Sequence, residues 1–208
     1  MDQLEILKKD WKKQESSLPK LSREDLSKLM YKKSSSIVKW IFIISVLEFM
    51  LPHIIYLFID YDKVIQQYKE LDLYNFSLIS NIIFYAVVLV FIYLFYKNYR
   101  SISANSQPKV LMQNIMKTRK TVKYYIWFNL GMIPVIAGVT LFKTFNSSEF
   151  TDKVPENISM VLVWLISIIL ILALVVLFWL FYRLIYGILL NKLEKNYNEL
   201  VSNDTDLS

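Results

Sequence analysis

The feature that most constrains this chain is the separation of its apolar and charged residues along the sequence. Four apolar runs of 19 to 25 residues contain only two charged side chains, Lys39 and Glu48. The runs cover residues 37–59, 76–96, 124–142 and 158–182. A soluble domain mixes charged and apolar residues within each element, so this pattern indicates a membrane protein.

Each run is long enough to cross a bilayer. At about 1.5 Å per helical residue, the runs reach roughly 28 to 38 Å, against about 30 Å of hydrocarbon. Because lipid offers no partner to backbone amides, each span must be helical, and the kinks expected from Gly131, Pro134 and Gly138 are tolerated. The sequence therefore predicts an all-α membrane protein with a bundle of four transmembrane helices.

The distribution of basic residues predicts the orientation. Lys and Arg number nine in residues 1–36, two in 60–75, seven in 97–123, two in 143–157 and three in 183–208. Since basic residues concentrate on the cytoplasmic side, both termini and the middle loop are expected in the cytoplasm. The predicted organisation is a cytoplasmic amphipathic arm (1–36), a first transmembrane hairpin (37–96), a basic cytoplasmic loop (97–123), a second hairpin (124–182) and a cytoplasmic helical tail (183–208).

The two halves of the chain resemble each other at an offset of about 84 residues. Lys33–Lys39 parallels Lys117–Lys123, and Leu51-Pro52 parallels Ile133-Pro134. One interpretation is a parallel duplication of a helix plus a transmembrane hairpin. The alternative is that any hairpin starting in the cytoplasm has basic residues before it and aromatic and basic residues where it returns.

The arm carries two short apolar stripes at helical spacing, and the second follows a helix start at Ser22. Acidic residues interrupt its basic residues, which weakens attraction to anionic lipid. The stripes could dock into the groove of a cytoplasmic protein or pack on the other cytoplasmic helices. The predicted partner-binding residues are Leu4, Leu7, Trp11, Leu26 and Met30.

The patterns of the middle loop and the tail also predict helices. Pro108 suits the first turn of a helix, on which one face is apolar and the other basic. A basic amphipathic helix favours the membrane surface, so Lys117, Arg119, Lys120 and Lys123 are predicted to contact anionic headgroups. The apolar face comprises Leu111, Ile115, Thr118 and Val122. In the tail, Tyr186, Leu189, Leu193, Asn196 and Leu200 continue the last span as a helix with a narrow apolar seam.

Glu48 is the residue within the membrane that most needs an explanation. It lies 11 residues from each end of its run, where an ionised side chain facing lipid costs at least ~3 kcal/mol. It must therefore face the bundle, be protonated, or both. Tyr85 and Ser167 are the expected partners because each lies nine residues from the outer end of its own run.

Other polar residues accompany Glu48 in the runs. His53 lies closer to the outer end, level with Asn81, and Asn129 lies in the inner third of the third run. Glu48 with His53 could form a proton relay or a cation site. The alternative is structural, in which a protonated glutamate is a hydrogen-bonded contact between helices.

Enzyme motifs are missing from the sequence. The chain has no Cys and one His, and it has no Gly-rich phosphate loop, GxSxG or HExxH motif. We therefore expect no enzymatic activity, metal or cofactor. Nucleic-acid binding is not expected either, because the predicted cytoplasmic location of the middle loop already accounts for its positive charge.

Several segments resemble a group of poorly characterised bacterial inner-membrane proteins with four spans. The resemblance lies in Leu4–Gln14, Leu18–Ser22, Lys32–Lys39 and Leu189–Leu200. Genes of this group often lie beside a gene for an extracytoplasmic-function sigma factor. The resemblance implies a multi-pass protein of the bacterial cytoplasmic membrane with an anti-sigma-like role for its cytoplasmic arm.

Two functional hypotheses follow. The first is a membrane-anchored regulatory or interaction protein that binds a cytoplasmic partner, a sigma factor by the resemblance. The second is a small transporter or channel component that uses Glu48 and His53. A homodimer would suit either hypothesis, although Gly131 and Gly138 are seven residues apart and form no GxxxG motif.

Overall fold

The computed structural model describes residues 23–103, 108–152, 155 and 158–205. Within these residues the chain is entirely helical and contains no strand, which confirms the predicted all-α class. The helices are α2 (Arg23–Tyr56), α3 (Tyr61–Glu70), α4 (Tyr74–Ser103), α5 (Pro108–Phe145), α6 (Ser148–Thr151) and α7 (Met160–Thr205).

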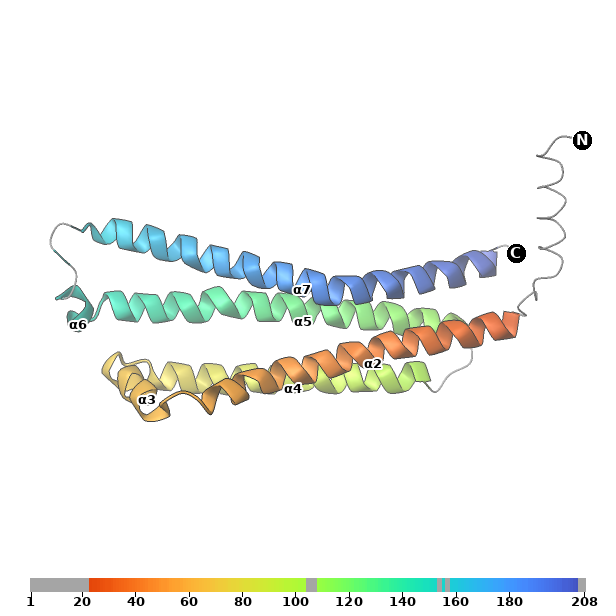
Figure 1. Ribbon diagram of the computed structural model, residues 1–208, viewed down its shortest axis with the longest axis horizontal. Helices are drawn as coiled ribbons and strands as arrows, with labels where there is room; N and C mark the ends of the chain where they lie inside the picture. Colours follow the sequence, from red (N-terminus) through yellow and green to blue (C-terminus); the bar gives the residue numbers. More distant parts are fainter. Residues whose placement is uncertain (1–22, 104–107, 153–154, 156–157, 206–208) are drawn as a thin grey trace, which may run out of the picture.

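The four long helices form two antiparallel hairpins (Figure 1). The first is α2 and α4, joined through the short helix α3, and the second is α5 and α7, joined through α6. Helix α4 packs beside α5, and α2 packs beside α7, so the four helices close into a ring. We call the end at Arg23 and Thr205 the terminal end, and the end at α3 and α6 the hairpin end.

The long helices extend well beyond the apolar runs. Helix α7 has 46 residues, which is about 69 Å and more than twice the hydrocarbon thickness of a bilayer. Each long helix contains a segment apolar and long enough to cross a membrane. The apolar runs form the half at the hairpin end, and the charged segments 23–36, 97–103, 108–123 and 183–205 form the half at the terminal end. The described parts of the arm, the middle loop and the tail are therefore continuous with the spans, and for the tail this continuation was predicted.

The well-packed core lies mainly in the terminal half. Its fully buried members come from all four long helices, and they are Val38, Ile41, Phe95, Ile102, Leu111, Ile115, Val122, Tyr186 and Leu193. The predicted seam of the tail is confirmed, since Tyr186, Leu193, Asn196 and Leu200 are buried and Leu189 is partly buried against the core. Each long helix has an apolar seam in this half, and the seams bury their apolar surface against one another.

The prediction that the middle loop lies on the membrane surface is wrong for its apolar face. Leu111, Ile115, Thr118 and Val122 are buried against the other helices instead of facing lipid. Among the predicted headgroup residues, Arg119 forms an ion pair with Glu194 of α7 at 2.9 Å. The remaining three, Lys117, Lys120 and Lys123, are exposed, and their contact with headgroups stays a prediction.

Two buried polar contacts join the hairpins in the terminal half. The Asn196 amide donates to the Ser34 hydroxyl at 3.1 Å, and the Asn98 amide donates to the Thr121 hydroxyl at 3.5 Å. A buried amide that finds its partner in only one alignment favours that alignment over shifted ones. These pairs therefore help to set how the two hairpins align along the bundle axis.

The hairpin end contains a helix that the sequence analysis did not predict. Helix α3 begins after Asp60, whose carboxylate accepts from the Lys63 amide, and it ends at a turn in which Asp72 is left-handed (φ 51°). The Leu73 amide donates to the Tyr68 carbonyl at 2.7 Å, the pattern of a helix C-terminus that closes through a left-handed residue. This turn directs the chain into α4.

An ion pair links the hairpins at this end. Lys143 of α5 donates to Asp72 at 2.8 Å, and this hydrogen bond together with the charge attraction lowers the pKa of Asp72. The pair therefore contributes stability at neutral pH that is lost as the pH falls through the lowered pKa. Because both side chains are exposed, that contribution is small.

Candidate functional site

A cavity of about 1000 Å³ lies between the two hairpins. All four long helices contribute to its walls, which are mostly apolar. The polar side chains among the lining residues are Glu48, Tyr85, Tyr125, Asn129, Thr140, Ser167 and Tyr182. Tyr125 and Tyr182 also belong to the buried core, so the floor of this cleft rests on the packed half of the bundle.

The cleft exists because the helices diverge toward the hairpin end. Helices α2 and α7 lie close together at the terminal end and furthest apart at the hairpin end (Figure 1). Several lining residues are also exposed, Leu51 by 58% and Leu170 by 63%, so the cleft opens sideways.

The carboxyl group of Glu48 lies at the floor of the cleft. Its Oε2 accepts hydrogen bonds from the Tyr125 hydroxyl at 2.7 Å and the Tyr186 hydroxyl at 3.1 Å. Its Oε1 is buried and has no hydrogen-bond partner among the described residues. The backbone of Glu48 is also affected, because Pro52 of α2 has no N–H to donate to the Glu48 carbonyl.

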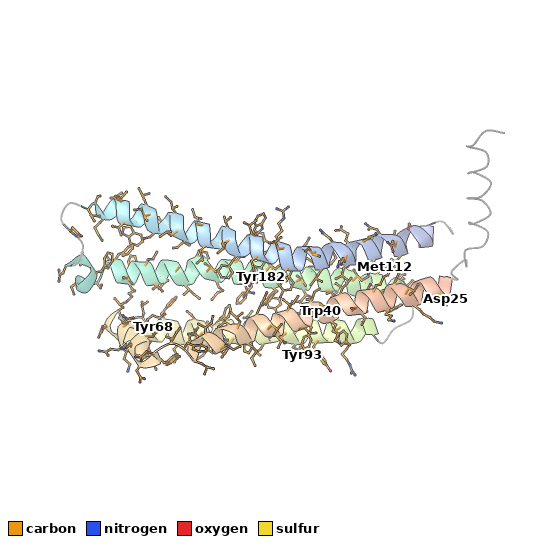
Figure 2. The ribbon with its side chains drawn as sticks, in the orientation of Figure 1. Asp25, Trp40, Tyr68, Tyr93, Met112 and Tyr182 are labelled. Atoms are coloured by element: carbon orange, nitrogen blue, oxygen red, sulfur yellow. The ribbon has the colours of Figure 1, made fainter. Side chains whose placement is uncertain are left out.

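Aromatic rings surround this carboxyl group. The rings of Tyr125, Tyr182 and Tyr186 lie 5.9 to 6.3 Å from one another. Phe91 and Phe95 of α4 each lie 5.5 Å from Tyr125, in edge-on contacts. Figure 2 shows Tyr182 near the middle of the bundle, and this residue both lines the cleft and belongs to the buried core. The floor of the cleft therefore combines one carboxyl group with several π-systems.

Four of the six polar residues predicted within the membrane line this cleft, and they are Glu48, Tyr85, Asn129 and Ser167. The expected pairing of Glu48 with Tyr85 or Ser167 is wrong, because its oxygen accepts from Tyr125 and Tyr186. The Ser167 hydroxyl instead donates to the Val163 carbonyl at 2.8 Å. The Asn129 amide donates to the Tyr125 carbonyl at 2.8 Å.

His53 and Asn81 are not among the residues that line the cleft. His53 is exposed, and its Nδ1 lies 2.9 Å from the Phe49 carbonyl, to which it donates. Its ring contacts Phe49 and Tyr85, at centroid distances of 5.2 and 5.3 Å. The Asn81 amide donates to the Ser77 hydroxyl at 3.4 Å. The predicted relay from Glu48 to His53 is therefore not formed in this arrangement.

Sequence reasoning missed Tyr125 and Tyr186 because it assigned depth from the ends of the apolar runs. Tyr125 is the second residue of the third run, and Tyr186 lies beyond the end of the fourth. In the structure both meet Glu48, which is central in its own run, so the runs of the two hairpins are staggered along the axis. One sequence feature could have identified Tyr186 as a buried residue, namely its position on the apolar seam of the tail.

The predicted partner-binding residues divide into two groups. Leu4, Leu7, Trp11 and the side chain of Leu26 lie outside the described residues. Met30 is buried in the core of the bundle, as expected if this part of the arm packs on the other helices. Met30 is therefore not available to a partner on the surface of α2.

The fold and the cleft define an all-helical protein with four helices able to span a membrane and a cavity between its hairpins. The family described as "Domain of unknown function (DUF8845)" matches residues 24–205. The chain therefore belongs to this family, and the match covers the whole helical bundle. No curated protein and no solved structure matches the chain.

Proposed function

We propose that this protein is a multi-pass integral membrane protein that binds a small hydrophobic molecule in the cleft at Glu48, as a small transporter or a component of one. The observation that carries the proposal is a cavity of about 1000 Å³ with mostly apolar walls and the Glu48 carboxyl, which is hydrogen-bonded to Tyr125, at its floor. Pockets of roughly 300 to 1000 Å³ with this distribution of polarity are typical of small-molecule sites.

The arrangement of the bundle supports placing its hairpin half in the membrane. The most apolar segment of α7 has a mean hydropathy of 3.4, and none of it is buried inside the protein. Exposed apolar helices of this length are stable in lipid and not in water. The terminal half, with its charged surface and dense core, then stands in the cytoplasm as a continuation of the spans.

The two hairpins share a plan that supports a parallel duplication. Each consists of a long helix, a short helix and a second long helix, in the same order along the bundle. The first long helix of each hairpin has a proline in its interior, Pro52 in α2 and Pro134 in α5. Ser34 and Thr118, 84 residues apart, are both fully buried. The shared plan extends the similarity between the halves from the sequence to the packing.

The proposed orientation can be tested with single cysteines, because the natural chain has none. We expect a membrane-impermeant maleimide applied to intact cells to label Asp62→Cys, in α3, and to leave Lys109→Cys and Lys195→Cys unlabelled. All three positions are exposed in the structure, so permeabilised cells should label all three. Labelling of Lys109→Cys in intact cells would reverse the proposed orientation.

Occupation of the cleft can be tested by filling it. Ala137 lines the cleft, whereas Val135 on the same helix does not and is 54% exposed. In proteoliposomes carrying a photoreactive alkyl diazirine, we expect Ala137→Trp to reduce labelling of cleft residues by about tenfold, a loss of about 1.4 kcal/mol of binding. Val135→Trp should leave it unchanged. Equal cleft labelling in both variants would count against ligand binding there.

The regulatory hypothesis concerns a different part of the molecule. Binding of a cytoplasmic partner such as a sigma factor depends on the stripe at Leu4, Leu7 and Trp11, which lies outside the described residues, and it stays a prediction. Homodimerisation also stays a prediction. Gly131 and Gly138 have nothing within 4 Å of the position that a Cβ would occupy, so neither is needed for packing within the described bundle.

A further inference from the structure

We infer that the cleft selects a lipophilic quaternary ammonium ion, with the alkylated cation against the tyrosine rings at Glu48 and its apolar tail along the cleft walls. This inference rests on the proposed binding function and adds the chemical class of the ligand. It also assigns an entry route from the lipid between α2 and α7. Four observations carry it.

The first observation is the charge of the cleft. Among the described residues that line it, Glu48 alone carries a charged side chain. No ion pair in the described part of the chain joins Glu48 to a cation. The nearby basic residue Arg183 lies over the Trp179 ring at 5.2 Å and does not line the cleft. A carboxylate in such surroundings requires a proton or an external cation.

The second observation is the arrangement of aromatic rings. Tyr125 and Tyr182 line the cleft, their rings lie 6.3 Å apart, and the ring of Tyr125 is attached to the hydroxyl that contacts Glu48. Because the Tyr125 hydroxyl donates to the carboxyl at 2.7 Å, an ionised Glu48 polarises this phenol and makes its ring face more negative. Aromatic ring faces attract alkylated ammonium ions.

The third observation concerns hydrogen bonding. Glu48 Oε2 already accepts from two tyrosine hydroxyls, and Oε1 is shielded from solvent. A primary ammonium would need several hydrogen-bond acceptors, whereas a quaternary ammonium has no N–H to satisfy. A metal ion would require several oxygen ligands, and one carboxyl group in an apolar cleft does not supply them. The site therefore favours a cation that is held by charge and ring faces.

The fourth observation is the shape of the opening. Leu51 of α2 and Leu170, Leu174 and Phe178 of α7 line the cleft and are also exposed. They lie on the two helices that diverge toward the hairpin end (Figure 1). An amphiphile dissolved in the bilayer can therefore pass between α2 and α7 with its tail in apolar surroundings throughout.

The test uses the full-length protein in phosphatidylcholine proteoliposomes and three photoreactive probes with the same aryl-diazirine alkyl tail. Their head groups are trimethylammonium, hydroxyl and sulfonate. Labelling of cleft residues, normalised to labelling of the lipid-facing Leu165, which is 53% exposed, corrects for partition into the bilayer. We expect the trimethylammonium probe to label the cleft about tenfold more than the hydroxyl probe, and the sulfonate probe to label it least.

Variants separate the role of Glu48 from that of the cleft. Glu48→Gln should remove the preference for the cation and keep labelling by the hydroxyl probe. The control is Asp62→Asn, because Asp62 is an exposed carboxylate outside the cleft. This control should keep both the preference for the cation and the labelling by the hydroxyl probe. A competition experiment in the natural protein needs no substitution, so its result does not depend on whether the Glu48→Gln variant folds. Unlabelled dodecyltrimethylammonium should displace the hydroxyl probe, and dodecyl sulfate should not.

The outcomes distinguish the inference from the proposed function. If the hydroxyl probe labels the cleft as strongly as the cation, or if Glu48→Gln keeps the preference, the cation selectivity is overturned and the cleft remains a ligand site. If none of the three probes labels the cleft, both the inference and the proposed function fail.

Discussion

Replacing Ile115 by Asp will destabilise the protein by about 3 to 5 kcal/mol or prevent its folding, because the new carboxylate would be buried without a partner. Ile115 is 0% exposed in the terminal half of the bundle, whereas the adjacent Met116 is 47% exposed. The matched variant Met116→Asp places the same charge on the surface of the same helix. It should cost less than about 1 kcal/mol.

Thermal unfolding of the detergent-solubilised protein, followed by the fluorescence of its 5 Trp residues, will measure this difference. A second readout is protection of residues 115–123 from trypsin, which should be lost in Ile115→Asp and kept in Met116→Asp. If this segment lay on the membrane surface, neither substitution would affect the unfolding of the bundle. Equal stability of the two variants would therefore contradict the packed terminal half.

The combined change of Tyr125 and Tyr186 to Phe will destabilise the bundle by about 2 to 4 kcal/mol. It removes both hydrogen bonds to Glu48 Oε2 and leaves the carboxyl group without a partner among the described residues. Hydrogen bonds to charged groups contribute about 1.5 to 3 kcal/mol each, and those between membrane helices about 1 kcal/mol. Tyr93→Phe is the matched control, because Tyr93 is 61% exposed.

A third variant identifies the cause of this loss. Adding Glu48→Leu to the double variant should recover most of the stability, because the unpaired buried group is then gone. Unfolding in mixed micelles of increasing sodium dodecyl sulfate content will report all four proteins. Failure of Glu48→Leu to recover stability would show that the tyrosine hydroxyls act on something other than this carboxyl group.

The helices themselves were predictable because hydropathy and helical spacing are local properties. The runs at 37–59 and 158–182 lie within or overlap α2 and α7, and the 3-4 spacing after Arg183 correctly predicted a continued helix. Pro108 begins α5 as expected. Helix α3 was missed because a short connecting segment with mixed charge gives little hydropathy signal, and its turn depends on a left-handed Asp72.

The middle loop shows where local reasoning failed. Its basic, amphipathic pattern is the same for a helix on the membrane surface and for a helix with one face buried in a bundle. What decided between them was the presence of matching seams on α2, α4 and α7, which bury Leu111, Ile115 and Val122. No single segment of the sequence contains that information.

By itself, the sequence determined four long apolar helices, their connection into two hairpins and the isolation of Glu48 among apolar residues. Only the tertiary structure decided which groups meet that carboxyl. Tyr125 and Tyr186 are 77 and 138 residues away from Glu48 in the chain. Their approach depends on how the helices align along the bundle axis, which packing of the terminal half sets. The same alignment leaves the helices of the two hairpins separated in the hairpin half. The cleft therefore forms with the Glu48 carboxyl at its floor.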